Sequence, residues 1–321
     1  MTQSITRLWI ILLGGVALLG QASCKSNSDS NKTTTVPNMQ ALPDSLRLNW
    51  TYNLERPSGI MPLPEELEEV SGLSYGADSQ IFMLNDELGA YYIFSLNTQA
   101  VESKVSFALA GDYEGIELVG DQLFALRSDG QIFQMGDPYN EDPPMESFRT
   151  MLSNNDDTEG LGYDPQTGKL LIACKEPSRY RNRDDRWRAV YGYDIATHEV
   201  AEVPVLEIDL AEIKAEMMAS AVTDKEIERA REFEVEKEKS FKPSAIAVHP
   251  ITGHYYLLAS AGKLIIVLNR AGQVIGAKHL PRNPFSQPEG ICFSPEGDMF
   301  ISNEARDGQA TLLWFEYQPN Q

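Results

Sequence analysis

The chain has 321 residues and a formal net charge of −20, from 47 acidic and 27 basic side chains. Because this charge repels a phosphate backbone, we expect no binding to nucleic acid. Three cysteines are too few for a disulfide framework, and Cys174 and Cys292 lie in separate apolar runs, so we expect both to be small buried hydrophobic residues.

Residues 1–24 have the pattern of a secretory targeting segment. Arg7 precedes an apolar run from Leu8 to Gly20, which is short for a membrane span and suits a signal peptide. Small residues then lead to Cys24, and this approach resembles the lipobox of bacterial lipoproteins, although Gln21 stands where an aliphatic residue is usual. The resemblance implies that Cys24 is acylated; the alternative is ordinary cleavage beside an incidental cysteine. Residues 25–41 are rich in Ser, Asn, Thr and Lys and are expected to form a flexible tether.

A five-residue motif recurs along the rest of the chain. It consists of an acidic or polar residue, any residue, Ser or Glu, a small residue, and Leu or Ile. The small residues are 43, 45, 85 and 45 positions apart, and the five copies begin at Glu69, Asp112, Asp157, Lys242 and Gln287. A period of roughly 40–50 residues indicates a repeated supersecondary unit.

Each repeat contains several short apolar strands separated by turns. The turns at 164–168 and 294–297 have Pro in second place and Gly at the end, which suits a tight connection between antiparallel strands. Four such strands make one blade of a β-propeller. A β-sandwich also has short strands, but it gives no reason for a fixed period. We therefore predict an all-β fold, a β-propeller of five four-stranded blades within residues 42–321.

The last repeat ends after its third strand, at 310–317, and we expect residues 46–54 to supply the fourth. The 85-residue interval could hide a sixth blade. However, Asp209 and Thr223 each precede a Glu by three positions, which is a helix-start signal, and Leu210, Ile213 and Met217 share a helical face. We therefore predict a helical insertion at about 209–240 and keep six blades as the alternative.

Acidic residues recur where the inner strand of each blade should begin. Glu114, Glu159 and Glu289 would converge near the axis with Ser71 and Ser244, and crowded carboxylates either take up protons or hold a cation. Ca²⁺ suits such a site because it accepts many oxygen ligands in flexible geometry. A second ring of candidate ligand-binding residues follows the second strands: Asp86, Asp129, Glu176 and Glu304. Alternatively, the Glu side chains only accept hydrogen bonds from backbone N–H groups between neighbouring blades.

Nucleophilic catalysis has little support in the sequence. The four histidines lie outside both rings, and His249 and His254 flank a turn that should be on the surface. No nucleophile elbow, phosphate-binding loop or zinc spacing is present. Five arginines between 179 and 188 form a basic run, which suits either a loop for an anionic ligand or a solvated connection.

Several segments resemble the SdiA-regulated family of bacterial β-propeller proteins. The resemblance rests on the Glu-Gly-Ile and Glu-Gly-Leu motifs and on residues 242–254 and 288–304, and it covers nearly all of 66–317. It departs at Ser244-Ala245, where the family more often has Ser-Gly, and in the insertion. The resemblance implies an envelope-associated propeller and no established activity. Related propeller groups include calcium-dependent lactonases, phosphotriesterases and phytases, which is an analogy of fold.

The sequence therefore favours a lipid-anchored envelope propeller, facing the periplasm or the exterior, that binds an ion, a small anionic ligand or an envelope protein. Ca²⁺ in the central channel is the preferred cofactor. A Ca²⁺-dependent hydrolase of esters, lactones or phosphoesters is the alternative, in which metal-bound water would attack the substrate. A purely structural role in the envelope is a third possibility.

Overall fold

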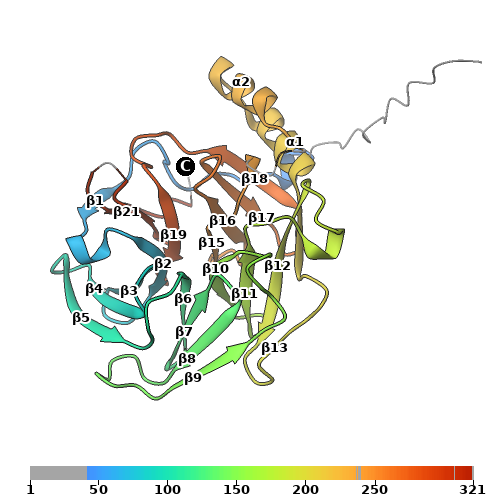
Figure 1. Cartoon of the computed structure of the whole chain (residues 1–321). Coiled ribbons are helices and arrows are strands. Elements are labelled where there is room, and N and C mark those ends of the chain that lie inside the picture. Colours follow the sequence, from blue (N-terminus) through green and yellow to red (C-terminus); the bar gives the residue numbers. More distant parts are fainter. Residues whose placement is uncertain (1–41, 236, 238–239, 307, 320–321) are drawn as a thin grey trace, which may run out of the picture. The chain divides into compact units, whose positions relative to one another are not determined.

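The computed structural model describes residues 42–319 apart from 236, 238, 239 and 307. Within this range the strands form five antiparallel sheets that lie around a common axis (Figure 1). The five-bladed β-propeller is confirmed, and the alternative of six blades is wrong. The predicted targeting segment 1–24 and tether 25–41 lie outside the described residues.

The first two blades each run outward from the axis in chain order. Blade one consists of β2 (Val70–Tyr75), β3 (Gln80–Asn85), β4 (Ala90–Ser95) and β5 (Ala100–Ser106). Blade two consists of β6 (Tyr113–Val119), β7 (Gln122–Arg127), β8 (Gln131–Met135) and β9 (Met145–Arg149). β4 is buried throughout, whereas β5 is mostly exposed, as expected for the outermost strand of a blade.

Blades three and four continue the same order. Blade three consists of β10 (Thr158–Asp164), β11 (Lys169–Cys174), β12 (Trp187–Asp194) and β13 (Glu199–Val200), with β14 (Leu206–Asp209) also paired to β12. A 3-10 turn, η3 (Arg179–Arg181), precedes β12. Blade four consists of β15 (Ala245–Val248), β16 (Tyr255–Ala259), β17 (Leu264–Leu268) and β18 (Val274–His279).

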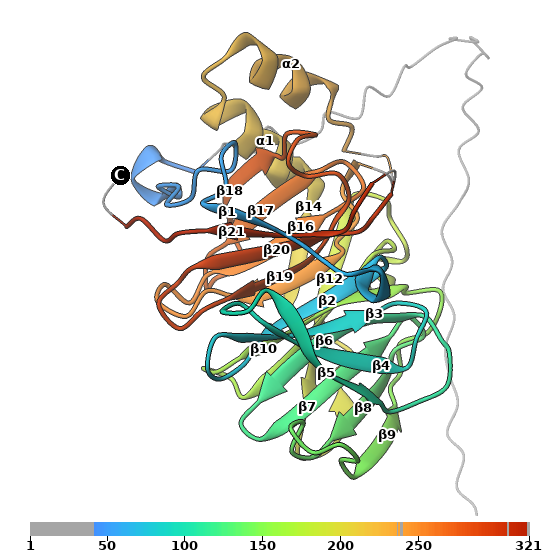
Figure 2. The same cartoon turned by 90° about the vertical axis from the view of Figure 1, so that its left-hand side faces the viewer.

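Blade five is completed by a strand from the start of the domain. β19 (Pro288–Phe293), β20 (Met299–Asn303) and β21 (Thr311–Phe315) pair in order, and β1 (Gly59–Pro62) pairs with β21, with Met61 opposite Leu312 (Figure 2). The closing segment predicted at 46–54 is therefore wrong. That segment instead packs Tyr52 and Leu54 against the core between blades four and five. Pro62 fits β1 because this strand lies at a sheet edge.

The described connections before blade one also contain two 3-10 turns, η1 (Asp44–Leu46) and η2 (Glu65–Leu67). Leu67 in η2 is fully buried, so the chain between β1 and β2 stays against the propeller. None of the helices in the described part of the chain is both long and apolar enough to cross a bilayer.

The predicted helical insertion is present between β14 and β15. It contains α1 (Leu210–Ser220) and α2 (Asp224–Glu232). The Asp209 side chain accepts a hydrogen bond from the Ala211 N–H, while Thr223 and Glu226 form a complete capping box. Leu210, Ile213 and Met217 are buried as the sequence predicts, and α1 packs beside β18 (Figure 2). The insertion is therefore part of the hydrophobic core rather than a loose surface loop.

The small residue of the recurring motif lies where inner strands meet. β2, β6, β10, β15 and β19 contact one another in turn around the axis. A Cβ atom on Gly72 would lie 2.8 Å from the Ile116 nitrogen of β6, and one on Gly160 would lie 2.9 Å from the Ala245 carbonyl carbon of β15. Both distances are shorter than a carbon atom tolerates. The motif therefore recurs because five strands crowd together at the axis.

The hydrophobic core lies between successive blades. One cluster joins Phe124 and Leu126 of blade two to Leu170 and Ile172 of blade three, and Tyr193 completes it. Cys174 belongs to the same cluster and Cys292 to another, and both are free thiols, as expected from the sequence. Because each sheet is covered on both faces by its neighbours, the blades hold the axial strands in fixed register.

Candidate functional site

The Ser or Glu at the third position of the recurring motif lies in a β-bulge in four of the five inner strands. The strand register shifts between Tyr113 and Gly115 and between Thr158 and Gly160, so Glu114 and Glu159 are the extra residues. Similar shifts span Ser71 in β2 and Glu289 in β19. A bulge interrupts the ladder and redirects a side chain. The sequence indicated these positions but not the bulges that set them apart from ordinary strand residues.

Glu114, Glu159 and Glu289, here called the channel carboxylates, lie close enough to influence one another. Burial raises the pKa of Glu114 to about 10, and the charges of Glu159 and Asp112 add to the rise. Burial also raises the pKa of Glu289, although hydrogen bonding with Ser260 opposes this. The charges of neighbouring acids thus contribute to the raised pKa of Glu114.

A lysine lies among the channel carboxylates. Lys175, which follows β11, forms an ion pair with Glu159 and lies 3.7 Å from an Asp157 carboxylate oxygen. Burial raises the pKa of Glu159 and the Lys175 ammonium opposes that rise. Part of the negative charge is thus balanced by the protein itself. The sequence placed Lys175 beside the second ring without assigning it this role.

A different set of acids brings three carboxylate oxygens close together. Glu69, Asp86 and Glu304, here called the acidic triad, each place a carboxylate oxygen within 4.8 Å of the others. Glu69 precedes β2, Asp86 follows β3 and Glu304 follows β20, so the triad joins blades one and five. Two backbone bonds hold this junction: Asp86 N–H donates to the Glu69 carbonyl at 3.0 Å and Ala305 N–H to the Glu68 carbonyl at 2.9 Å.

The acidic triad has the electrostatics of a site that favours a positive charge. Burial raises the pKa of Asp86 to about 6, and Glu69 contributes to the rise. Burial raises the pKa of Glu304 to about 8, with Glu289 the strongest of the neighbouring charges. Neither these residues nor Glu69 forms an ion pair with a described Lys or Arg. The Oδ1 atom of Asp86 is buried and has no hydrogen-bond partner in the described structure.

Two of the predicted ligand-binding residues, Asp86 and Glu304, belong to the acidic triad, and the other four make internal contacts. Ser71 donates to the Tyr113 carbonyl at 2.8 Å and Ser244 to the Pro288 carbonyl at 3.3 Å, so each links its blade to the next. The remaining two are acids in ion pairs, each with an oxygen 2.8 Å from a basic nitrogen: Asp129 with Arg127 and Glu176 with Lys242.

Glu69 was missed as a site residue, although a signal for it was present. It occupies the first position of the recurring motif, as Asp112 and Asp157 do. The prediction instead used the third position of the motif, which Glu114, Glu159 and Glu289 occupy. The antiparallel return of the second strand brings the first position beside Asp86.

The basic run between 179 and 188 is largely balanced by acids of its own blade. Arg181 pairs with Glu207 at 2.6 Å, Arg183 with Asp156 at 2.7 Å, and Arg186 with Asp209. Neither a free anion-binding loop nor a merely solvated connection describes it. These ion pairs fasten the long β11–β12 connection to the blade.

The sequence predicts His249 on the surface, and this prediction is wrong. His249 is buried, and its Nδ1 atom accepts from the Ile251 and Thr252 N–H groups at 3.2 Å. Nε2 therefore carries the proton and donates to the Tyr52 hydroxyl at 2.8 Å, which donates to the Gly297 carbonyl at 2.6 Å. Burial lowers the pKa of His249 to about 4, so it serves as a neutral link between the first segment and blades four and five.

Comparisons with known proteins bear on the fold. No family model matches the sequence, and no curated protein matches it. Among solved structures, Myxococcus xanthus glutaminyl cyclase is similar with a TM-score of 0.51 and 14% identity, over 82% of this chain and 96% of that chain. The PQQ-bound aldose sugar dehydrogenase of Streptomyces coelicolor has a TM-score of 0.48 and 10% identity, over 81% and 97% respectively. At 14% identity the likeness to the glutaminyl cyclase supports the β-propeller fold and transfers no activity to this chain.

Proposed function

We propose that the chain is a binding module of the bacterial envelope that holds a hard cation such as Ca²⁺ at the acidic triad. The observation that carries this proposal is the approach of three carboxylates within 4.8 Å, with no basic side chain paired to them in the described structure. Their mutual repulsion would be relieved by a cation. An all-oxygen donor set suits Ca²⁺ better than a transition metal.

The two groups of acids differ in how their charge is balanced. The channel carboxylates have Lys175 beside Glu159, whereas the acidic triad has the unpartnered Asp86 Oδ1. The triad is therefore the better starting point for a cation. Among the channel carboxylates, Glu289 contributes most to the raised pKa of Glu304. The proposed Ca²⁺ site therefore moves from Glu114, Glu159 and Glu289 to the acidic triad, with Glu289 as the channel carboxylate that would join it.

Thermal melting tests the cation site directly. Ca²⁺ that binds only the folded protein should raise the melting temperature with concentration, by about 2.7 kcal/mol of stability at a hundred times the dissociation constant. The double variant Asp86→Asn with Glu304→Gln should lose this response. Asp121→Asn is the control, because it removes an exposed acid from the β6–β7 turn. A parent protein that melts identically in chelator and in millimolar Ca²⁺ would exclude the site.

An activity screen separates this module from the alternative of a Ca²⁺-dependent hydrolase. We expect no Ca²⁺-stimulated turnover of a lactone, an aryl ester or a phosphate monoester. All four histidines lie within the described residues. None of their described hydrogen bonds involves the acidic triad or a channel carboxylate. Turnover that disappears in the Asp86→Asn, Glu304→Gln variant would instead establish the hydrolase.

The envelope location rests on the sequence of the first 24 residues and on the resemblance to the SdiA-regulated family. Cys24 lies outside the described residues, so its acylation is tested in cells. Cys24→Ala should release the protein from the membrane fraction and abolish labelling by a clickable fatty acid. A parent protein that never labels, with a variant that stays membrane-bound, would refute the lipid anchor. The proposed partners remain an envelope protein or a small anionic ligand.

A further inference from the structure

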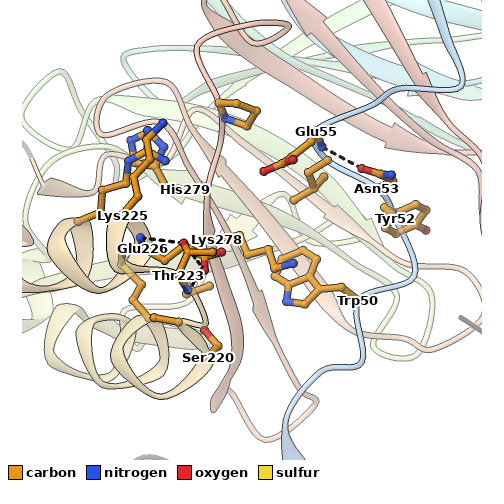
Figure 3. Close-up of a pocket in the computed structure, with 16 residues that line it drawn as sticks. Trp50, Tyr52, Asn53, Glu55, Ser220, Thr223, Lys225, Glu226, Lys278 and His279 are labelled. Atoms are coloured by element: carbon orange, nitrogen blue, oxygen red, sulfur yellow. Dashed lines mark hydrogen bonds between the residues drawn. The ribbon is translucent and has the colours of Figure 1, made fainter.

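A pocket of about 420 Å³ lies between the helical insertion and the propeller, away from the acidic triad. In Figure 3, Ser220, Thr223, Lys225 and Glu226 of the helical insertion line one side, and Trp50 from the first segment lines the other. Lys278 of β18 lies between them. The volume is in the range of pockets that bind small molecules.

Several positive groups line this pocket without forming a close ion pair. Lys225, Arg229 and Lys278 form no ion pair within 4.0 Å in the described structure, although the chain as a whole has a net charge of −20. The Nδ1 atom of His279 is buried and lacks a hydrogen-bond partner among the described residues. Burial lowers the pKa of His279, and the charge of Arg229 contributes to this. The converging charges of Lys225, Arg229 and Lys278 favour an anion.

Two carboxylates, Glu55 and Glu226, also line the pocket. Burial lowers the pKa of Lys278 and the charges of Glu226 and Glu55 oppose this, but in the described structure neither carboxylate forms an ion pair within 4.0 Å with Lys225, Arg229 or Lys278. The Oε2 atom of Glu226 accepts hydrogen bonds from Val222 N–H and from the Thr223 N–H and hydroxyl, at 2.9–3.0 Å, so this oxygen caps α2. Glu55 is exposed at the rim. An anion that enters would therefore meet Lys225, Arg229 and Lys278 on the remaining surface.

The pocket also offers an aromatic and apolar surface. The Lys278 ammonium lies 5.0 Å from the centre of the Trp50 ring, which fixes the cation beside an aromatic face. Leu54, Met217, Ala277 and Pro281 contribute further apolar lining. A ligand that uses both parts of the surface must carry an apolar ring and a negative charge.

We infer that this pocket is a binding site for a small aromatic carboxylate. The carboxylate is held by Lys278, Lys225 and Arg229, and the ring packs against Trp50 and Met217. The site is independent of the proposed cation site, so either can fail without the other.

Ligand-observed NMR on the full-length protein tests the site with indole-3-acetate, and with indole-3-acetamide as the neutral counterpart. The acetate should bind at least about tenfold more tightly, because a hydrogen bond to a charged group is worth roughly 1.5–3 kcal/mol. Lys278→Met should lower the affinity for the acetate about tenfold and leave that for the acetamide nearly unchanged.

Lys104→Met is the matched control, since Lys104 also lies 5.0 Å from an aromatic ring, that of Tyr92, on a different blade. It should bind indole-3-acetate as the parent does. Equal affinity for acetate and acetamide, an equal loss in both lysine variants, or no binding of either compound at millimolar concentration would overturn the inference. Thermal melting of each variant confirms that the protein compared is folded.

Discussion

Lys175 and Glu159 show how a buried charge is accommodated at the axis. Glu159 is 4% exposed, so removing its partner would leave a carboxylate unpaired in a poorly solvated position. We expect Lys175→Met to lower the free energy of unfolding by about 1–3 kcal/mol, measured by urea denaturation, because the Lys175 side chain is partly exposed. Adding Glu159→Gln should restore most of the loss. If the double variant is no more stable than Lys175→Met, the ion pair is not the cause.

Glu117 predicts a pH dependence of stability. Burial raises its pKa from 4.5 to about 8 in the folded protein, with hydrogen bonding to Ser74 opposing the rise. Between these two values the folded protein keeps a proton that the unfolded chain has released. Its contribution to stability is therefore fully present below about pH 4.5 and falls, by up to about 1.4 kcal/mol per pH unit, as the pH rises towards 8.

Replacing Glu117 by Gln should remove this part of the pH dependence. Urea denaturation of parent and variant at pH 5, 6, 7 and 8 measures the difference, which should grow in favour of Glu117→Gln with rising pH. Parallel stability curves for the two proteins would contradict the assignment.

At the residue scale, the sequence predicted where in the fold the acids lie but not which side chains they contact. The repeat placed Glu114, Glu159 and Glu289 near the axis because strand order alone brings equivalent positions together. It could not show that Lys175 pairs with Glu159, or that Ser71 bonds to the next blade. Such contacts depend on bulges and side-chain directions that leave no mark on the period of the motif.

The helical insertion changes from an accessory to a structural element once its packing is known. Ile213 of α1 is fully buried in the cluster shared with blades three and four. Replacing Ile213 by Ala should therefore cost about 2–5 kcal/mol of unfolding free energy, by loss of apolar contact and creation of a cavity.

Ile251→Ala is the control for this substitution, because Ile251 lies in the turn after β15 and is 55% exposed. Thermal melting should distinguish the two variants clearly. Equal melting temperatures would mean that α1 does not contribute to the core of the propeller.

The elements that could be predicted were those with their own local signals. Thr223 and Glu226 predict the start of α2 because they can form a capping box. The Pro and Gly of the 164–168 and 294–297 turns predict hairpins. β1 has no such signal: it is four residues long and contains both Gly59 and Pro62. Its strand conformation comes from pairing with β21, which only the closed ring provides. The sequence therefore favours the more strand-like segment 46–54 as the fourth strand of blade five.

For the molecule as a whole, closure through β1 predicts an asymmetry between adjacent residues. Met61 is 7% exposed and packs into the core, whereas Ile60 is 54% exposed. Met61→Lys should weaken closure, lower the melting temperature and leave β21 as an open edge that can pair with another chain.

Ile60→Lys should have little effect on either property. Size-exclusion chromatography and thermal melting of the two variants provide the comparison. If both remain monomeric with the same melting temperature as the parent, pairing between β1 and β21 is not what secures the ring.

The pairing of β1 with β21 also sets an order of events during synthesis. Blades one to four consist of strands that follow one another in the chain, so each can form as it is made. Blade five forms later, because β1 is made before blade one and β21 after blade four. A ribosome that stalls late, or a stop codon shortly before residue 311, would therefore remove the partner of β1 and leave blade five unfinished. The ring therefore closes only once β21 has been made, and the contact that closes it joins distant parts of the chain.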